Sequence, residues 1–357
     1  MGKLIGILMI AFVALLALQG AATYQVMGFC TMNARPFPPG SVETILTLNE
    51  GNHPEGIAVD RQGNIYVANR SHETGGVLPV ILKIAKDGTD AEYARLPLTT
   101  DPDAEGLLGL AVNPQDVLYA ALVSLDSNQG VWKVHQDGSV EHLSGSQDME
   151  FPNALDFDNR GYLYVTDSAV GSIWRFDQKG QGEVWVQHES LEPVENFTGG
   201  WLPGANGIAF YPPNLLYVAN TSQGRIARIP INPDGSPGEP QIVAGLNEQD
   251  FLMLFTVDDI AVDTQGVVHA VIPGYLVTGS SPVVKVDPDT GEISRSVTEP
   301  DAIAQFDVPL SIAFGAGARD NQSVFVTNGA LIHPLIPRGN GAGVVQVGVG
   351  VPGYPGR

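Results

Sequence analysis

Four side chains that carry oxygen stand at the same point of a repeated motif, directly before a short apolar segment: Glu55, Asn153, Asn206 and Asp258. Carboxylate and amide oxygens are the ligands that a hard cation such as Ca²⁺ prefers in proteins. Asn, Asp and Glu before a strand are also ordinary turn residues, so a single occurrence would carry no weight. Because the four share one position of the motif, the pattern predicts a divalent cation site, with Ca²⁺ as the best-suited ion.

Proton transfer at such a site needs a base, and Asp258 is the candidate for a catalytic base or nucleophile beside the cation. Asp259 is a possible fifth ligand, although neighbouring side chains on a strand point to opposite faces. His53 and His333 are expected on loops near the same site, where each could transfer protons or form only local hydrogen bonds. The chain lacks a Gly-x-Ser-x-Gly motif and a zinc-protease His/Glu spacing, and its single cysteine, Cys30, precedes the repeats, so serine, cysteine and zinc-protease chemistries are disfavoured.

The repeat that places these residues returns about every fifty residues as two short strands joined by a turn. Its six copies are 56–60 with 63–69, 109–113 with 117–120, 154–158 with 161–167, 207–210 with 214–220, 260–263 with 266–270, and 312–314 with 324–328. Most copies are followed by a third strand, such as 173–176 or 283–286, and then by a turn and a fourth strand, such as 182–186. Four short antiparallel strands per unit predict an all-β fold, a six-bladed β-propeller.

The innermost strand of each propeller blade lines the central channel, so residues just before these strands converge on the axis. Reading that position through the six copies gives Glu55, Leu108, Asn153, Asn206, Asp258 and Leu310. The segment 42–48 has strand character but no partner strands of its own. We expect it to close the ring as the outer strand of the last blade, beside residues 344–347.

The chain ends differ in composition from the repeats. Lys3 is followed by an apolar stretch over 4–18 and then by small residues, which is typical of a secretory signal peptide over residues 1–22. The stretch is shorter than the ~20 residues of a membrane span, so no stable span is expected. The domain prediction continues with an N-terminal lead-in over 23–40, one propeller over 41–350 and a tail over 351–357. A secreted or periplasmic location follows, and one cysteine allows no internal disulfide.

Charge restricts the partners. The chain carries 39 acidic and 18 basic residues, for a formal net charge of −21. Such a surface repels phosphate backbones, so nucleic acid is not expected as a partner. A small-molecule substrate fits a channel site, and a partner protein stays open as an alternative.

Short motifs at the channel position resemble those of the regucalcin and gluconolactonase propellers, with paraoxonase and diisopropyl fluorophosphatase as more distant relatives. The motifs are Pro54-Glu55-Gly56, Pro152-Asn153-Ala154, Ala205-Asn206-Gly207-Ile208-Ala209 and Asp258-Asp259-Ile260-Ala261-Val262-Asp263, and the resemblance spans about residues 41–350. It implies a catalytic divalent cation, usually calcium, and hydrolysis of lactones, esters or phosphotriesters. The chain departs from the family at Asp259, where a Gly often follows the metal-binding Asp.

These observations together favour a metal-dependent hydrolase of a lactone or ester. The main alternative is a non-enzymatic propeller that binds a ligand or protein through the long stretches 71–79, 189–201 and 271–282. A lyase similar to strictosidine synthase is less favoured, because that chemistry does not require four oxygen ligands. Metal content separates the hydrolase from the other two hypotheses.

Overall fold

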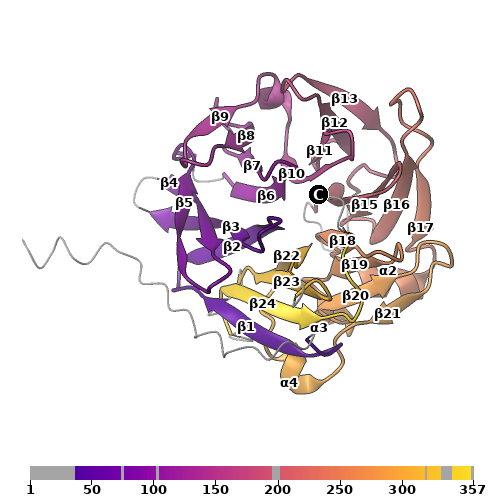
Figure 1. Cartoon of the computed structure of the whole chain (residues 1–357). Helices are drawn as coiled ribbons and strands as arrows, with labels where there is room; N and C mark the ends of the chain where they lie inside the picture. Colours follow the sequence, from indigo (N-terminus) through magenta and orange to yellow (C-terminus); the bar gives the residue numbers. More distant parts are fainter. Residues whose placement is uncertain are drawn as a thin grey trace, which may run out of the picture.

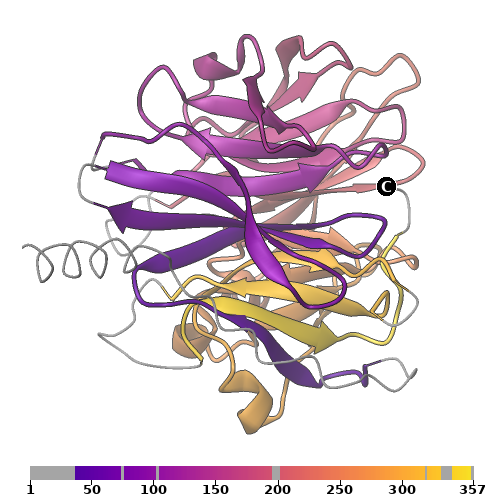
Figure 2. The ribbon, with the colours of Figure 1, turned by 60° about the vertical axis from the view of Figure 1, so that its left-hand side comes forward.

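The computed structural model describes residues 37–73, 76–101, 104–194, 202–317, 320–330 and 340–354. Six four-stranded antiparallel sheets surround a central channel in these residues, as predicted (Figure 1). The sheets stack side by side as blades, which is clear when the ring is turned (Figure 2). The predicted signal peptide over 1–22, Cys30 and His333 lie outside the described residues. Among those described, no helix is both long and apolar enough to span a membrane.

Each of the first five blades uses four consecutive strands, from the channel outward. They are β2 (Asn52–Val59), β3 (Ile65–Glu73), β4 (Gly76–Ile84) and β5 (Asp90–Arg95) in blade 1; β6 (Gly106–Val112), β7 (Leu118–Val123), β8 (Gly130–Val134) and β9 (Val140–His142) in blade 2; β10 (Pro152–Phe157), β11 (Leu163–Asp167), β12 (Ser172–Phe176) and β13 (Gly182–Gln187) in blade 3; β14 (Ala205–Tyr211), β15 (Leu215–Asn220), β16 (Arg225–Pro230) and β17 (Gln241–Ala244) in blade 4; β18 (Ile260–Val262), β19 (Val268–Val271), β20 (Val283–Val286) and β21 (Ile293–Arg295) in blade 5. Short helices η1 (Ser146–Asp148), α2 (Glu248–Leu254), α3 (Tyr275–Thr278) and α4 (Pro300–Ile303) lie in the connections.

The sixth blade joins the two ends of the chain. Its strands are β22 (Pro309–Phe314), β23 (Ser323–Asn328), β24 (Gly343–Gly348) and, as the outer strand, β1 (Val42–Thr47). The antiparallel register pairs Val42 with Val347 and Thr47 with Gly343, which confirms the predicted ring closure. Figure 1 shows β1 along the outer edge of this blade. Gln305, just after α4, holds β1 in place, because its Nε2 donates to the Val42 carbonyl at 2.9 Å.

Small residues let the inner strands approach one another at the axis. A Cβ added to Gly56 would lie 2.1 Å from the Leu108 carbonyl oxygen, and one added to Gly109 would lie 2.1 Å from that of Asn153. The next position of the repeat is a branched aliphatic residue in all six blades, and the six line one small cavity on the axis: Ile57, Leu110, Leu155, Ile208, Ile260 and Ile312. All six are buried. We call this set the aliphatic ring, and it divides the channel into two ends.

A repeated Asp turn joins each of three inner strands to the strand that follows it. The Asp263 Oδ1 accepts the backbone N–H groups of Gln265 and Val267 at 2.8 and 3.0 Å, and its Oδ2 lies 3.1 Å from His269 Nε2. Asp60 and Asp158 form the same turns and face Tyr66 and Tyr164 in place of the histidine. His269 is therefore a structural residue of blade 5.

Candidate functional site

The predicted ligands stand at one end of the channel, which we call the mouth. Asn153 and Asn206 are the second residues of the inner strands β10 and β14, Glu55 lies within β2, and Asp258 comes shortly before β18. The Asn206 Nδ2 donates to the Asp258 Oδ1 at 2.7 Å across the boundary between blades 4 and 5. Glu55 lies close enough to Asp258 to raise its pKa. The fold therefore brings these side chains together from blades that are distant in sequence.

Burial controls the protonation of both acidic groups. Burial is the largest cause of a raised pKa of about 7 at Glu55; Arg70 opposes it, and the nearby Glu105 and Asp259 add to it. Burial also raises the pKa of Asp258 well above its usual range, with Glu55 and Asp259 adding to the effect. The Asn206 hydrogen bond and Arg70 act in the opposite direction. Two carboxyl groups that share a desolvated site would be stabilised in their ionised form by a bound cation.

The two amides are fixed by hydrogen bonds from their nitrogen atoms. The Asn153 Nδ2 donates to the Ser168 hydroxyl at 3.1 Å, and the Asn206 Nδ2 donates to the Thr221 hydroxyl at 2.9 Å as well as to Asp258. Both side chains are buried, at 6% and 4% exposure. A donating amide nitrogen cannot ligate a cation, so the oxygen is the atom of each side chain that could.

Threonine hydroxyls hold the backbone of the mouth residues, a feature that the sequence analysis missed. Thr327 donates to the Glu55 carbonyl at 2.5 Å, Thr166 to that of Asn206 at 2.8 Å, and Thr221 to that of Val257 at 2.7 Å. Thr166 and Thr327 occupy equivalent positions in the second strands of blades 3 and 6, where blades 1 and 4 have Ala. Comparison of that position across the repeats would have revealed them.

Arg70 is a cation at the mouth that the sequence analysis also missed. Its Nη1 donates to the Glu105 carbonyl at 2.6 Å and to the Glu105 carboxylate at 2.5 Å. The same nitrogen lies 4.0 Å from the Glu55 Oε2. Its side chain is 10% exposed. Arg70 therefore places a buried positive charge beside one of the candidate ligands.

Asp259 faces the next blade. Its Oδ1 accepts the N–H of Ile260 at 2.8 Å, and its Oδ2 accepts the Ile312 N–H at 3.2 Å and the Ser311 hydroxyl at 2.5 Å. A carboxylate that accepts these hydrogen bonds joins blade 5 to blade 6. This contact accounts for an Asp at a position where Gly56 and Gly109 stand in blades 1 and 2.

His53 was expected on a loop, but it lies within β2, paired opposite Arg70. The prediction was wrong because the β2–β3 hairpin starts at Asn52, three residues before the mouth position Glu55. Its Nδ1 lies 3.0 Å from the Gly329 carbonyl oxygen. This contact links blade 1 to the end of β23.

The donor set fits a hard divalent cation. The described part of the chain has no cluster of three or more His, Cys, Asp or Glu side chains arranged to hold a metal ion. The mouth instead offers two carboxylates and two amides, and calcium accepts both kinds of oxygen together with water. Two partly buried carboxyl groups, whose pKa values are raised by desolvation, are the observation that favours a cation there.

Comparisons with known proteins give a family match and a common fold. Residues 42–71 match the family described as strictosidine synthase-like, N-terminal. No curated protein is a significant match to the sequence. A gluconolactonase from Xanthomonas campestris is 17% identical, with 94% of this chain and 99% of that chain covered and a TM-score of 0.57.

Two further solved structures have the same fold. A calcium-binding regucalcin from Agrobacterium tumefaciens is 17% identical over 85% of this chain and 92% of that chain, with a TM-score of 0.59. A luciferin-regenerating enzyme is 14% identical over 88% and 97%, with a TM-score of 0.62. At these identities the likeness shows the fold. It is consistent with the regucalcin and gluconolactonase-like propellers that the motifs resemble.

Proposed function

We propose that this propeller is a calcium-dependent hydrolase that cleaves a lactone or ester at the mouth. The observation that carries the proposal is the partly buried pair Glu55 and Asp258. Desolvation raises the pKa of both carboxyl groups, Glu55 raises that of Asp258 further, and the Asp258 Oδ1 accepts a hydrogen bond from the Asn206 amide. Neighbours of the same fold include a gluconolactonase and a calcium-binding regucalcin, which supports this choice. A small-molecule substrate fits the mouth, because the aliphatic ring separates the mouth from the other end of the channel. The substrate would therefore have to fit within one end.

In this proposal Glu55, Asn153, Asn206 and Asp258 would hold the cation. When bound, it would polarise the substrate carbonyl as a Lewis acid. The Asp258 carboxylate, which a bound cation would keep ionised, would accept a proton from the attacking water. Asn206 keeps the Asp258 Oδ1 oriented through its 2.7 Å hydrogen bond. Glu55 and Asn153 would bind the cation, and Asp258 would be the group that accepts the proton.

The proposal is tested by calcium titration calorimetry, followed by hydrolysis assays with δ-lactones and aryl esters before and after chelation. Calcium binding with turnover that chelation abolishes is the expected result. Calcium binding without turnover of either class would favour the non-enzymatic binding propeller. No calcium binding at neutral pH would overturn the metal-dependent function.

Calcium should stabilise the protein more at pH 8 than at pH 5.5. The pKa of Glu55 is raised from 4.5 in the unfolded chain to about 7 in the folded protein. The contribution of Glu55 to the free energy of unfolding is therefore full below pH 4.5 and is lost as the pH rises through about 7. Calcium binds the ionised Glu55 carboxylate and competes with protons for it. Calcium should therefore stabilise the protein at the pH values where Glu55 loses its proton. We expect melting temperature to rise by a few degrees with calcium at pH 8 and hardly at pH 5.5, measured by differential scanning fluorimetry.

A chelator at each pH serves as the control for that experiment. Equal calcium-induced shifts at the two pH values would show that Glu55 does not titrate with the binding site.

Replacement of Arg70 by Gln should strengthen calcium binding. The guanidinium lies 4.0 Å from the Glu55 carboxylate and would repel a cation bound there. We expect the calcium dissociation constant to fall by roughly threefold to tenfold, measured by calorimetry at low ionic strength. The matched control is Arg95→Gln, because Arg95 pairs with Glu92 on an exposed surface. A weaker or unchanged affinity in Arg70→Gln would contradict a cation bound next to Glu55.

A further inference from the structure

A second pocket lies at the end of the channel opposite the mouth. Its walls come from the final residues of the inner strands of five blades: Val59, Phe157, Phe210, Val262 and Phe314. Its volume is about 310 Å³, which is the size of a small-molecule site. The aliphatic ring lies between this pocket and the mouth. We call it the far-end pocket, and the proposed hydrolysis does not use it.

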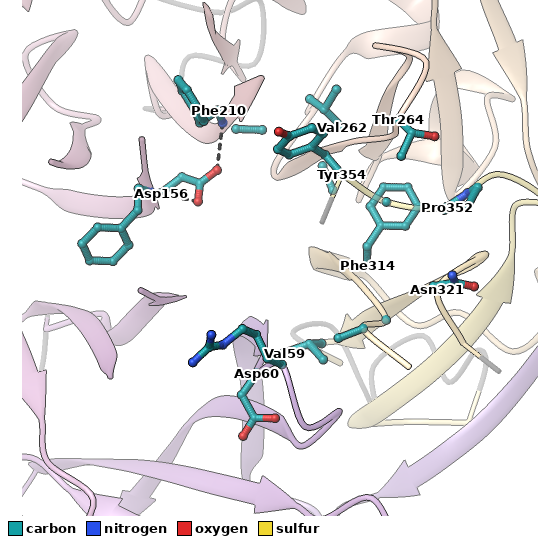
Figure 3. Close-up of a pocket in the computed structure, with 17 residues that line it drawn as sticks. Val59, Asp60, Asp156, Phe210, Val262, Thr264, Phe314, Asn321, Pro352 and Tyr354 are labelled. Atoms are coloured by element: carbon teal, nitrogen blue, oxygen red, sulfur yellow. Dashed lines mark hydrogen bonds between the residues drawn. The ribbon is translucent and has the colours of Figure 1, made fainter. Parts of the chain in front are cut away.

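One acidic residue of the far-end pocket departs from the repeat. Asp156 occupies a position of the repeat at which the other five blades have Ala: Ala58, Ala111, Ala209, Ala261 and Ala313. Its side chain is 2% exposed and lines the pocket. Its Oδ1 accepts the Phe157 N–H and its Oδ2 the Phe210 N–H, each at 2.8 Å. These bonds fix the carboxylate at the pocket wall, as Figure 3 shows.

The other two charged side chains of the lining are engaged elsewhere. Arg61 forms a two-pronged ion pair with Asp116, with nitrogen–oxygen distances of 3.1 and 2.8 Å. The Asp60 carboxylate accepts backbone N–H groups of its own turn and the Tyr66 hydroxyl. Asp60 and Asp156 therefore both make the pocket wall negative, and Asp156 is the one that lies outside the Asp turns of the repeat.

Aromatic residues line the far-end pocket together with this carboxylate. Phe157 and Phe210 belong to β10 and β14, and Phe314 and Tyr354 line the pocket from β22 and from the C-terminal tail (Figure 3). Tyr354 belongs to the predicted C-terminal tail, whose backbone crosses this end of the channel. Thr264 N–H donates to the Pro352 carbonyl at 2.9 Å, and Gly353 N–H to that of Asn321 at 3.0 Å. The tail thus supplies one wall of the pocket.

We propose that the far-end pocket binds a small organic cation, an amine with an aromatic or aliphatic body. A protonated amine would donate to the Asp156 carboxylate, and the faces of the surrounding rings attract cations. The rings also bury the apolar body, and Thr264 and Asn321 offer polar groups at the rim. An anion would be repelled by Asp156, and a neutral molecule would gain only the apolar contacts.

The test is calorimetry at pH 7 with three probes of one shape: benzylamine, benzyl alcohol and benzoate. We expect benzylamine to bind roughly tenfold more tightly than benzyl alcohol, with benzoate weakest. Asp156→Asn keeps the side-chain shape and should weaken benzylamine binding by roughly tenfold while benzyl alcohol binding is unchanged. Asp156→Ala is the second variant if Asn disturbs folding, because the other five blades fold with Ala there.

The acidic mouth could also attract an amine, so Asp258→Asn is the matched control. Loss of the preference for benzylamine in Asp156→Asn but not in Asp258→Asn supports the far-end pocket. Loss in Asp258→Asn alone would place the probe in the mouth and overturn the proposal. Equal binding of benzylamine and benzyl alcohol to the unaltered protein would also overturn it. None of these outcomes depends on whether the mouth binds calcium or hydrolyses esters.

Discussion

Asp258→Asn is expected to weaken calcium binding by at least about a hundredfold and to lower hydrolysis by about a thousandfold. The substitution removes a charged oxygen ligand and the proposed base in one step while keeping the side-chain shape. Asn206 can still form a hydrogen bond with the new amide. The measurements are calcium calorimetry and the rate of hydrolysis of the best lactone or ester from the substrate screen.

The fold should survive this change. Burial and the neighbouring carboxyl groups raise the pKa of Asp258, so replacing it by a neutral amide relieves an unfavourable charge. The calcium-free variant should therefore melt at a temperature equal to or above that of the unaltered protein. Functional residues commonly lower the stability of a protein in this way. Asp289→Asn is the control, because it removes the same charge from a side chain that is 87% exposed. Full activity in Asp258→Asn would remove Asp258 from the mechanism.

Leu46→Ala is expected to lower the free energy of unfolding by about 2–5 kcal/mol. Leu46 lies in the closing strand β1 and is 1% exposed. It belongs to an apolar cluster that includes Val80 and Leu82 of blade 1 and Val344 of blade 6. Truncation would leave a cavity where the last blade meets the first. Urea unfolding followed by circular dichroism measures the loss.

Glu43→Ala on the same strand is the control for this experiment, because Glu43 is exposed. Its effect should stay within about 0.5 kcal/mol. A similarly small effect of Leu46→Ala would show that β1 contributes little to holding the ring together.

The sequence was sufficient to predict the blades and the location of the mouth residues, because a strand repeat fixes which residues recur at one height of the channel. It also indicated the closing strand, since residues 42–48 had no partner strands nearby. Arg70 could not be predicted in this way. It reaches Glu55 only because the β2–β3 hairpin extends past the mouth, with His53 opposite Arg70 in the register.

Asp259 illustrates a second limit of what the sequence repeat can predict. Its position in the motif indicated a residue next to the cation site, but its direction depends on the spacing between blades 5 and 6. The Ser311 hydroxyl and the Ile312 N–H lie within reach of its carboxylate, and these groups are distant in sequence. Contacts between blades are set by packing, so the motif alone does not reveal them.

The pairing of β1 with β24 also determines when folding can finish. A ribosome makes β1 among the first residues of the propeller and β24 among the last, so the two strands meet only after the blades between them have been made. Closing a loop that spans the blades between β1 and β24 costs conformational entropy. The pairing of these two strands is therefore expected to form late. The earlier blades can form their own hairpins in the meantime, but the ring stays open. Completion of the fold therefore reports that all six blades have been made.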